Sequence, residues 1–122
     1  MTSMGPVVPM LRIFDEPKAK DFYVGFLGFK IEFEHRFGEN FPLYMGISRA
    51  DCHLHLTEHY GDAAPGAHVR IHTDNIDELA QELSRKGYRY AKPGAPQTAP
   101  WGDRQLTVTD PFSNRLTFVE RT

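Results

Sequence analysis

The sequence lacks the features that mark several broad classes of protein. Its one cysteine, Cys52, cannot form a disulfide within the chain and fits a reducing compartment. There is no long apolar run and no basic leader, so we expect neither a membrane span nor a signal peptide. The net charge of −2 comes from interspersed acids and bases without a basic tail, which argues against nucleic acid as a partner. We expect a soluble, cytoplasmic protein.

The length of 122 residues predicts one domain, residues 1–122, with two helices. The first helix follows Asp15, a favourable N-cap, and ends at Gly28. The second helix follows Asn75 and ends at Gly87. Each has apolar residues at helical spacing on one face: Ala19, Phe22, Tyr23 and Phe26 in the first, and Ile76, Leu79, Ala80 and Leu83 in the second.

The remaining segments alternate or are rich in β-branched and aromatic residues, which predicts strands. These segments are 30–37, 41–49, 52–59, 88–93, 104–109 and 115–120. The stretch "PMLRIFDEPKAKDFYVGFLGFKIEF" reads strand, Asp, helix, Gly, strand, and "AHVRIHTDNIDELAQELSRKGYRYA" repeats this order. The chain is therefore an internal duplication of a βαβββ module, over about 5–60 and 67–122, joined by the linker 61–67.

The motifs resemble those of a known superfamily. "VVPMLRIFD", "DFYVGFLGFKIEF" and "PWGDRQLTVTDPFSNRLTFVE" are similar to segments of the vicinal oxygen chelate, or glyoxalase and bleomycin-resistance, superfamily. The last of these segments resembles most closely the bleomycin-binding branch. The resemblance implies an α+β fold in which two tandem βαβββ modules form a curved mixed sheet. It also implies an arm-exchanged homodimer, in which Pro9 marks the exchanged arm.

The resemblance places four potential metal-ligand positions at Val8, His55, His68 and Thr117. Val8 cannot ligate, and Thr117 stands where a glutamate is expected. Glu120 is three residues further along a strand and therefore faces the other way. We expect no metal and no cofactor, with His55 and His68 as the fallback ligands. A metal-dependent lyase, dioxygenase or thiol transferase remains the alternative function, and a scaffold without ligand activity is a third.

Nucleophilic chemistry is not favoured by the other reactive residues. Neighbouring residues on a strand face opposite ways, so His53 is not expected to activate Cys52. Asp110 begins the turn "DPFSN", whose proline and asparagine are typical turn residues. We therefore expect no catalytic residues.

Binding is the preferred function, and Trp101 is its first candidate residue. It stands between Pro100 and Gly102, which disfavour regular structure, and it matches the Pro-Trp-Gly position of the bleomycin-binding branch. In that branch loop aromatics line clefts between subunits, where they stack on planar ligands. The resemblance implies a metal-free protein that binds or sequesters an antibiotic or planar aromatic molecule. The expected ligand-binding residues are Trp101, Tyr44, Phe33, Phe41, His55, His68, Arg12, Arg70 and Gln105.

Core packing remains the alternative for the phenylalanines, including Phe37. The expected concave face collects positive charge, with few carboxylates beyond Glu32 or Glu34. Its basic residues are Arg12, His53, His55, His68, Arg70 and His72, with Arg115 as a further candidate. A neutral or anionic ligand fits these charges better than cationic bleomycin does. Alternatively, these side chains pair with acids elsewhere and bind nothing.

Overall fold

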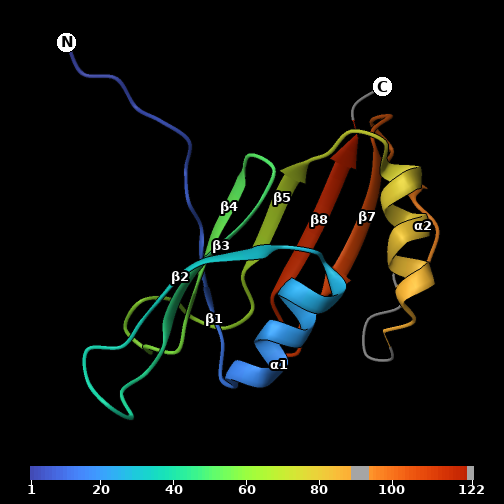
Figure 1. Cartoon of the computed structure of the whole chain (residues 1–122). Helices are drawn as coiled ribbons and strands as arrows, with labels where there is room; N and C mark the ends of the chain where they lie inside the picture. Colours follow the sequence, from blue (N-terminus) through green and yellow to red (C-terminus); the bar gives the residue numbers. More distant parts are fainter. Residues whose placement is uncertain (89–93, 121–122) are drawn as a thin grey trace.

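Two four-stranded mixed sheets and two helical segments form the fold in the computed structural model, which describes residues 1–88 and 94–120 (Figure 1). The first half contains β1 (Met10–Arg12), α1 (Glu16–Lys20), η1 (Asp21–Phe26), β2 (Lys30–His35), β3 (Tyr44–Arg49) and β4 (Cys52–Thr57). The second half contains β5 (His68–His72), α2 (Ile76–Lys86), β6 (Gln97–Thr98), β7 (Arg104–Thr109) and β8 (Arg115–Glu120).

The two halves have the same topology. Their strand orders are β1-β4-β3-β2 and β5-β8-β7-β6, with one parallel pair, β1 with β4 and β5 with β8, at the same place in each. The α+β class and the duplicated βαβββ topology are therefore confirmed. The predicted strand at 88–93 lies almost entirely outside the described residues, and the strand that pairs with β7 is β6.

The first helix differs from the sequence prediction in its second half. Asp15 caps it as predicted, because its carboxylate accepts a hydrogen bond of 2.9 Å from the Lys18 amide. After Lys20 the chain widens into the π-helical segment η1, in which the Leu27 amide donates to the Phe22 carbonyl at 2.9 Å. The predicted helix is therefore present, and the sequence pattern did not distinguish its π-helical half, since apolar residues three and four apart fit both helix types.

The second helix, α2, matches its prediction. It spans Ile76–Lys86, and its apolar residues are buried. Gly87 ends it with a φ of 62°, a left-handed conformation that glycine adopts without steric cost.

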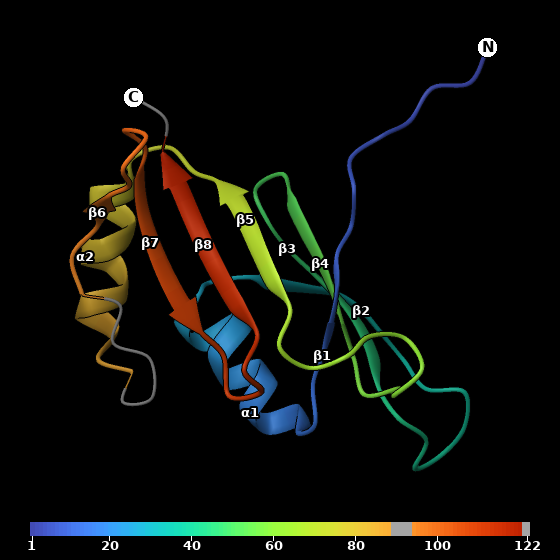
Figure 2. The same ribbon diagram turned by 180° about the vertical axis from the view of Figure 1, so that it is seen from behind.

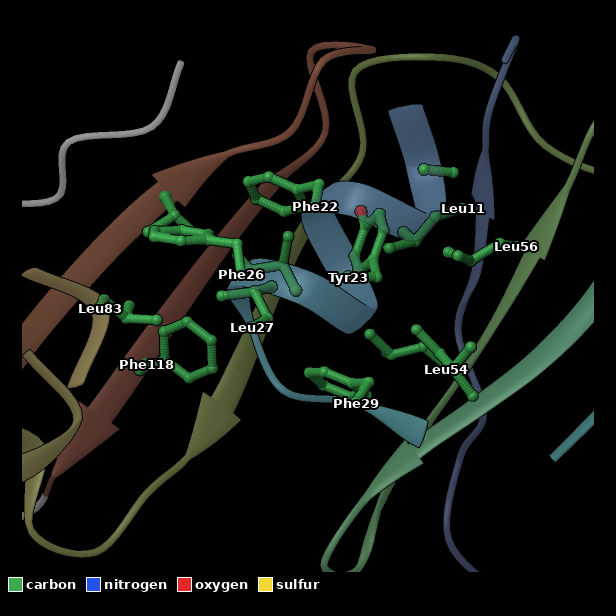
Figure 3. Packing of buried hydrophobic residues seen from close by; sticks show 14 of the residues in the cluster. Leu11, Phe22, Tyr23, Phe26, Leu27, Phe29, Leu54, Leu56, Leu83 and Phe118 are labelled. Carbon is green, nitrogen blue, oxygen red and sulfur yellow. The ribbon is translucent and has the colours of Figure 1, made fainter. Parts of the chain in front are cut away.

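One hydrophobic core is shared by both sheets. Phe22 and Phe26 of η1, and Leu27 directly after it, lie between Leu54 of β4 and Phe118 of β8 (Figure 3). Because each sheet turns its apolar residues toward this core, the polar faces of both sheets point away from it. Leu54, Leu56, Leu116 and Phe118 are accordingly buried.

A buried polar network also joins the two halves. The Tyr23 hydroxyl donates to the Asp110 carboxylate at 2.6 Å, and the Asn114 amide donates to Asp110 at 2.9 Å and to the Arg12 carbonyl at 2.8 Å. Burial, and then the Asp110 charge, raise the pKa of the Tyr23 hydroxyl well above its usual value. The "DPFSN" turn is thus a structural joint, because its acid accepts four hydrogen bonds inside the protein.

A second joint lies at the far end of η1. Arg49, at the end of β3, makes two hydrogen bonds of 2.8 and 2.9 Å to Glu82 of α2 and donates to the Leu27 carbonyl at 2.7 Å. Lys86 donates to the Phe26 carbonyl at 2.7 Å. Two cations therefore satisfy the carbonyl groups at the C-terminal end of η1, where the helix dipole favours positive charge.

The N-terminal arm, residues 1–9, forms no helix or strand, and its beginning extends away from both sheets (Figures 1 and 2). Its end stays on the first sheet, where the Pro9 carbonyl accepts a hydrogen bond of 3.0 Å from the His55 amide. Met1, Met4, Val7 and Val8 are exposed. Within residues 1–88 and 94–120, no helix has the length and apolar character needed to cross a lipid bilayer.

Candidate functional site

Three ring side chains form an aromatic cluster on the polar face of the first sheet. Phe33 of β2, Tyr44 of β3 and His55 of β4 contact one another, with ring centroids 5.3 to 6.2 Å apart. The Tyr44 hydroxyl lies 2.7 Å from Nδ1 of His55 and 3.2 Å from the Met10 sulfur. These are three of the predicted ligand-binding residues, and the structure brings them together.

Gly46 makes room for this cluster. It pairs with Phe33 on one side and with His55 on the other, so it lies beneath the rings. A Cβ atom at Gly46 would approach the Phe33 ring to 2.2 Å, well inside van der Waals contact. A register shift between Ile31 and Phe33 turns Phe33 onto this face. The missing side chain therefore allows the ring to lie flat against the sheet.

An aromatic pocket of about 340 Å³ opens beside the cluster. Its lining residues are Phe33, His35, Phe37, Tyr44, His59 and Asp62. Phe37 contacts both histidine rings edge to face, with centroids 4.6 Å from His35 and 5.9 Å from His59. Burial, and then the nearby Asp62 charge, raise the pKa of the Tyr44 hydroxyl, which therefore stays protonated near neutral pH. Nε2 of His59 is buried without a hydrogen-bond partner among the described residues.

The polar face of β5, β7 and β8, called here the basic face, carries the other predicted polar residues. Nε2 of His68 lies 2.7 Å from the Thr117 hydroxyl, which lies 2.8 Å from that of Thr107. Arg70 is exposed next to Thr117 in the strand register. Oε1 of Gln105 is buried with no partner among the described residues.

Trp101 lies in the turn between β6 and β7 and is 65% exposed. It is therefore not a core residue, and it lines neither the aromatic pocket nor the larger cavity between the two halves. Phe41 is also exposed and its ring packs against Gly38. Arg12 places its guanidinium 4.5 Å from the centre of the Phe14 ring. The structure thus leaves these three predicted residues outside the aromatic cluster.

A larger cavity of about 660 Å³ lies between the two halves, and sequence reasoning did not find it. Its apolar lining includes Leu27, Phe29, Val69 and Leu79, and its polar lining includes Arg49, Asp51, His53, Arg70, His72, Asp74, Glu78 and Glu82. No local pattern could reveal it, because its walls come from segments that only tertiary packing brings together. Cys52 also lines it, and burial raises the pKa of this thiol.

The comparison with known proteins assigns the family. The model of a family described as "Glyoxalase superfamily protein" matches residues 2–122. The chain belongs to the glyoxalase superfamily. No curated protein matches the sequence significantly.

Solved structures of other proteins share this fold. A bleomycin-binding protein complexed with bleomycin is 23% identical, with a TM-score of 0.77 over 98% of this chain and 100% of the other. The bleomycin-binding protein of Streptomyces verticillus, complexed with copper(II)-bleomycin, is 28% identical, with a TM-score of 0.74 and 97% of both chains covered. TnmS3, an antibiotic binding protein from Streptomyces sp. CB03234, is 24% identical, with a TM-score of 0.79 over 100% of both chains.

The residues of this superfamily member do not fit a catalytic metal. Within residues 1–88 and 94–120, no three His, Cys, Asp or Glu side chains are grouped so that they could hold an ion. Nδ1 of His55 and Nε2 of His68 are engaged by hydroxyl groups. Glu120 points to the opposite face from Thr117, as predicted, where it accepts a hydrogen bond of 3.3 Å from the Ile76 amide.

Proposed function

We propose that this superfamily member is a metal-free binding protein that sequesters a planar aromatic or antibiotic-type small molecule. The observation that carries the proposal is the aromatic cluster of Phe33, Tyr44 and His55 beside its pocket. These rings, of which Phe33 is exposed and Tyr44 and His55 are partly buried, are fixed by mutual contacts. They therefore offer a surface at low entropic cost, which suits stacking on a planar ligand. The fold is shared with proteins whose structures contain bleomycin, and this likeness supports a binding role.

The binding unit that we propose is a homodimer. In one chain Trp101 is exposed on the second half, away from the aromatic pocket of the first half. A second copy facing the first would place Trp101 across from that pocket and complete a cleft with two aromatic walls. The arm of residues 1–9 supports such pairing because it presents the exposed apolar side chains of Met4 and Val8 to solvent.

We also propose that the protein acts in the cytoplasm. Its single cysteine, Cys52, suits a compartment in which disulfides do not form.

Ligand binding can be tested by thermal shift with bleomycin and a panel of planar antibiotics and aromatic acids. A ligand at about 100 times its dissociation constant should stabilise the protein by roughly 2.7 kcal/mol. Calorimetry with the best panel member should then show that Trp101→Ala weakens binding by about 1 to 3 kcal/mol. Tyr60→Ala is the matched control, because Tyr60 is an exposed ring that lines neither cavity.

The two variants also separate binding from folding. Trp101→Ala should cost less folding stability than the roughly 3 to 5 kcal/mol typical of a buried aromatic residue. Equal loss of affinity in both variants, or no saturable binding by any panel member, would contradict the proposal.

A further inference from the structure

The basic face contains arginine and histidine but no acidic side chain. Its residues on β5, β7 and β8 are His68, Arg70, His72, Gln105, Thr107, Thr109, Arg115, Thr117 and Val119. Glu120 and Arg104, at the end of the same sheet, turn toward α2, where Arg104 pairs with Asp77. The whole chain carries a net charge of −2, so the positive charge of this face is a local excess. The acids nearest to it, Asp51, Asp74, Glu78 and Glu82, line the cavity that Arg70 and His72 also line.

The arginines of the polar faces lack carboxylate partners. Among residues 1–88 and 94–120, Arg36, Arg49 and Arg104 form ion pairs with acids. Arg12, Arg70 and Arg115 form none with any described residue. Within the described residues, the guanidinium groups of Arg70 and Arg115 therefore keep their donors for another acceptor. Arg12 is partly engaged, because its Nε donates to the Ile13 carbonyl at 3.4 Å and its guanidinium lies over the Phe14 ring.

Two of these arginines lie close to the joint between the sheets. The Asn114 side chain donates to the Arg12 carbonyl at 2.8 Å and accepts from the Ala67 amide at 3.1 Å. Asn114 directly precedes Arg115, which is paired with His68 in the strand register. Arg12 of β1 and Arg115 of β8 are thus held on either side of the buried Asn114. Arg70 lies two residues beyond His68, the β5 residue that pairs with Arg115.

The acids near these faces do not compensate for the arginines. Glu32 is bonded to Ser48 and paired with Lys30, and Glu34 turns toward α1 and pairs with Lys20 at 3.1 Å. Asp62 accepts a hydrogen bond of 2.7 Å from Thr57. Asp51, Asp74, Glu78 and Glu82 line the same cavity as Arg70, but none of them lies within ion-pair distance of it. Glu82 is paired with Arg49 and Lys86 instead.

We infer that the ligand is an anion, specifically a planar aromatic carboxylate. Its ring stacks on the aromatic walls of the proposed cleft, and its carboxylate binds to Arg70 on the basic face. This inference rests on the proposed binding function and adds the ligand's charge to it. A guanidinium with free donors can bind a carboxylate through two parallel hydrogen bonds. A cationic ligand would instead meet like charge, which lowers its affinity.

The test uses three probes of nearly the same shape: 2-naphthoate, 2-naphthamide and 2-naphthylmethylammonium. Calorimetry at low salt should show the anion binding at least about tenfold more tightly than the cation, with the amide between them. Added salt should weaken naphthoate binding and leave the amide unchanged. Arg70→Gln should reduce naphthoate affinity about tenfold or more and leave naphthamide affinity unchanged.

Arg85→Gln is the matched control, because Arg85 is exposed on α2, forms no ion pair with a described residue and lies away from the basic face. It should leave the affinities of all three probes unchanged. Equal affinities for the three probes, a preference for the cation, or an equal effect of the two arginine substitutions would overturn the inference while leaving small-molecule binding intact. If no probe and no member of the antibiotic panel binds, the proposed function itself fails.

Discussion

At the scale of single residues, a missing side chain defines the aromatic cluster. Phe33 can lie against the sheet because Gly46 has no Cβ atom. His55 then contacts the Phe33 ring edge to face at 5.3 Å, and its Nδ1 meets the Tyr44 hydroxyl. Such a constellation is preorganised, so a ligand that stacks on it loses little entropy in ordering side chains.

Gly46→Ala should therefore weaken ligand binding more than it weakens folding. The added methyl would displace the Phe33 ring, which is 43% exposed and can turn outward into solvent. We expect at least about a tenfold loss of affinity for the best panel ligand, with about 1 kcal/mol or less lost from the free energy of unfolding. Calorimetry and urea unfolding measure the two quantities.

Gly61→Ala is the control for that substitution, since Gly61 is in the linker with open space around its Cα atom. Unchanged affinity in Gly46→Ala would show that the position of the Phe33 ring does not matter for binding.

At the scale of elements, ion pairs at the end of η1 connect β3 to α2. Hydrogen bonding from Arg49 is the main cause that lowers the pKa of Glu82, with Lys86 adding to it. Since the folded-state pKa lies below the unfolded one, this pair stabilises the fold above the ordinary glutamate pKa of 4.5. That contribution is lost as the pH falls through the lowered value.

Glu82→Gln should accordingly destabilise the protein at about pH 7 by roughly 0.5 to 1 kcal/mol, because the carboxylate is partly exposed. The difference from wild type should shrink toward zero as the pH falls to about 3. Urea unfolding across this pH range provides the measurement, with exposed Glu39, which forms no ion pair with a described residue, as the Glu39→Gln control. A loss of unfolding free energy in Glu82→Gln that is the same at every pH would mean that the charge of Glu82 is not involved.

Local sequence patterns predicted those elements whose signals lie within the element itself. Asp15 predicted where the first helix begins, and Gly87 predicted where the second helix ends. The repeated strand–helix–strand order predicted the two duplicated sheets. The sequence left open whether Glu32 or Glu34 faces the site, because the register shift between Ile31 and Phe33 interrupts the alternation. The partners of Asp110 were also beyond prediction, since Tyr23 meets it only through tertiary packing.

For the candidate site, sequence spacing predicted which side chains share a face, but not how far apart the faces lie. The family resemblance, not spacing, selected Tyr44 together with His55 as ligand-binding residues, and the structure joins them by a hydrogen bond. The sequence could not reveal that Trp101 lies apart from them in a single chain, because that separation depends on how the two sheets pack.

At the scale of the whole molecule, the separation of Trp101 from the aromatic pocket makes the assembly state decisive. Light scattering should give twice the chain mass of 13.9 kDa at micromolar concentration. The interface should bury on the order of 1,200 Å² or more in total. Removal of residues 1–8 should weaken the dimer, because the beginning of this arm extends away from the rest of the chain (Figure 2). A full-length protein that remains monomeric would contradict the two-walled cleft.

The measurement that tests the central claim most directly is the intrinsic fluorescence of Trp101 during titration with the best-binding planar ligand. Trp101 is the protein's one indole, so the signal reports on a single position. We predict saturable quenching with the same dissociation constant that calorimetry gives, because the ligand stacks on this ring. Saturable heat of binding without any change in Trp101 emission would place the ligand elsewhere and contradict the proposed cleft.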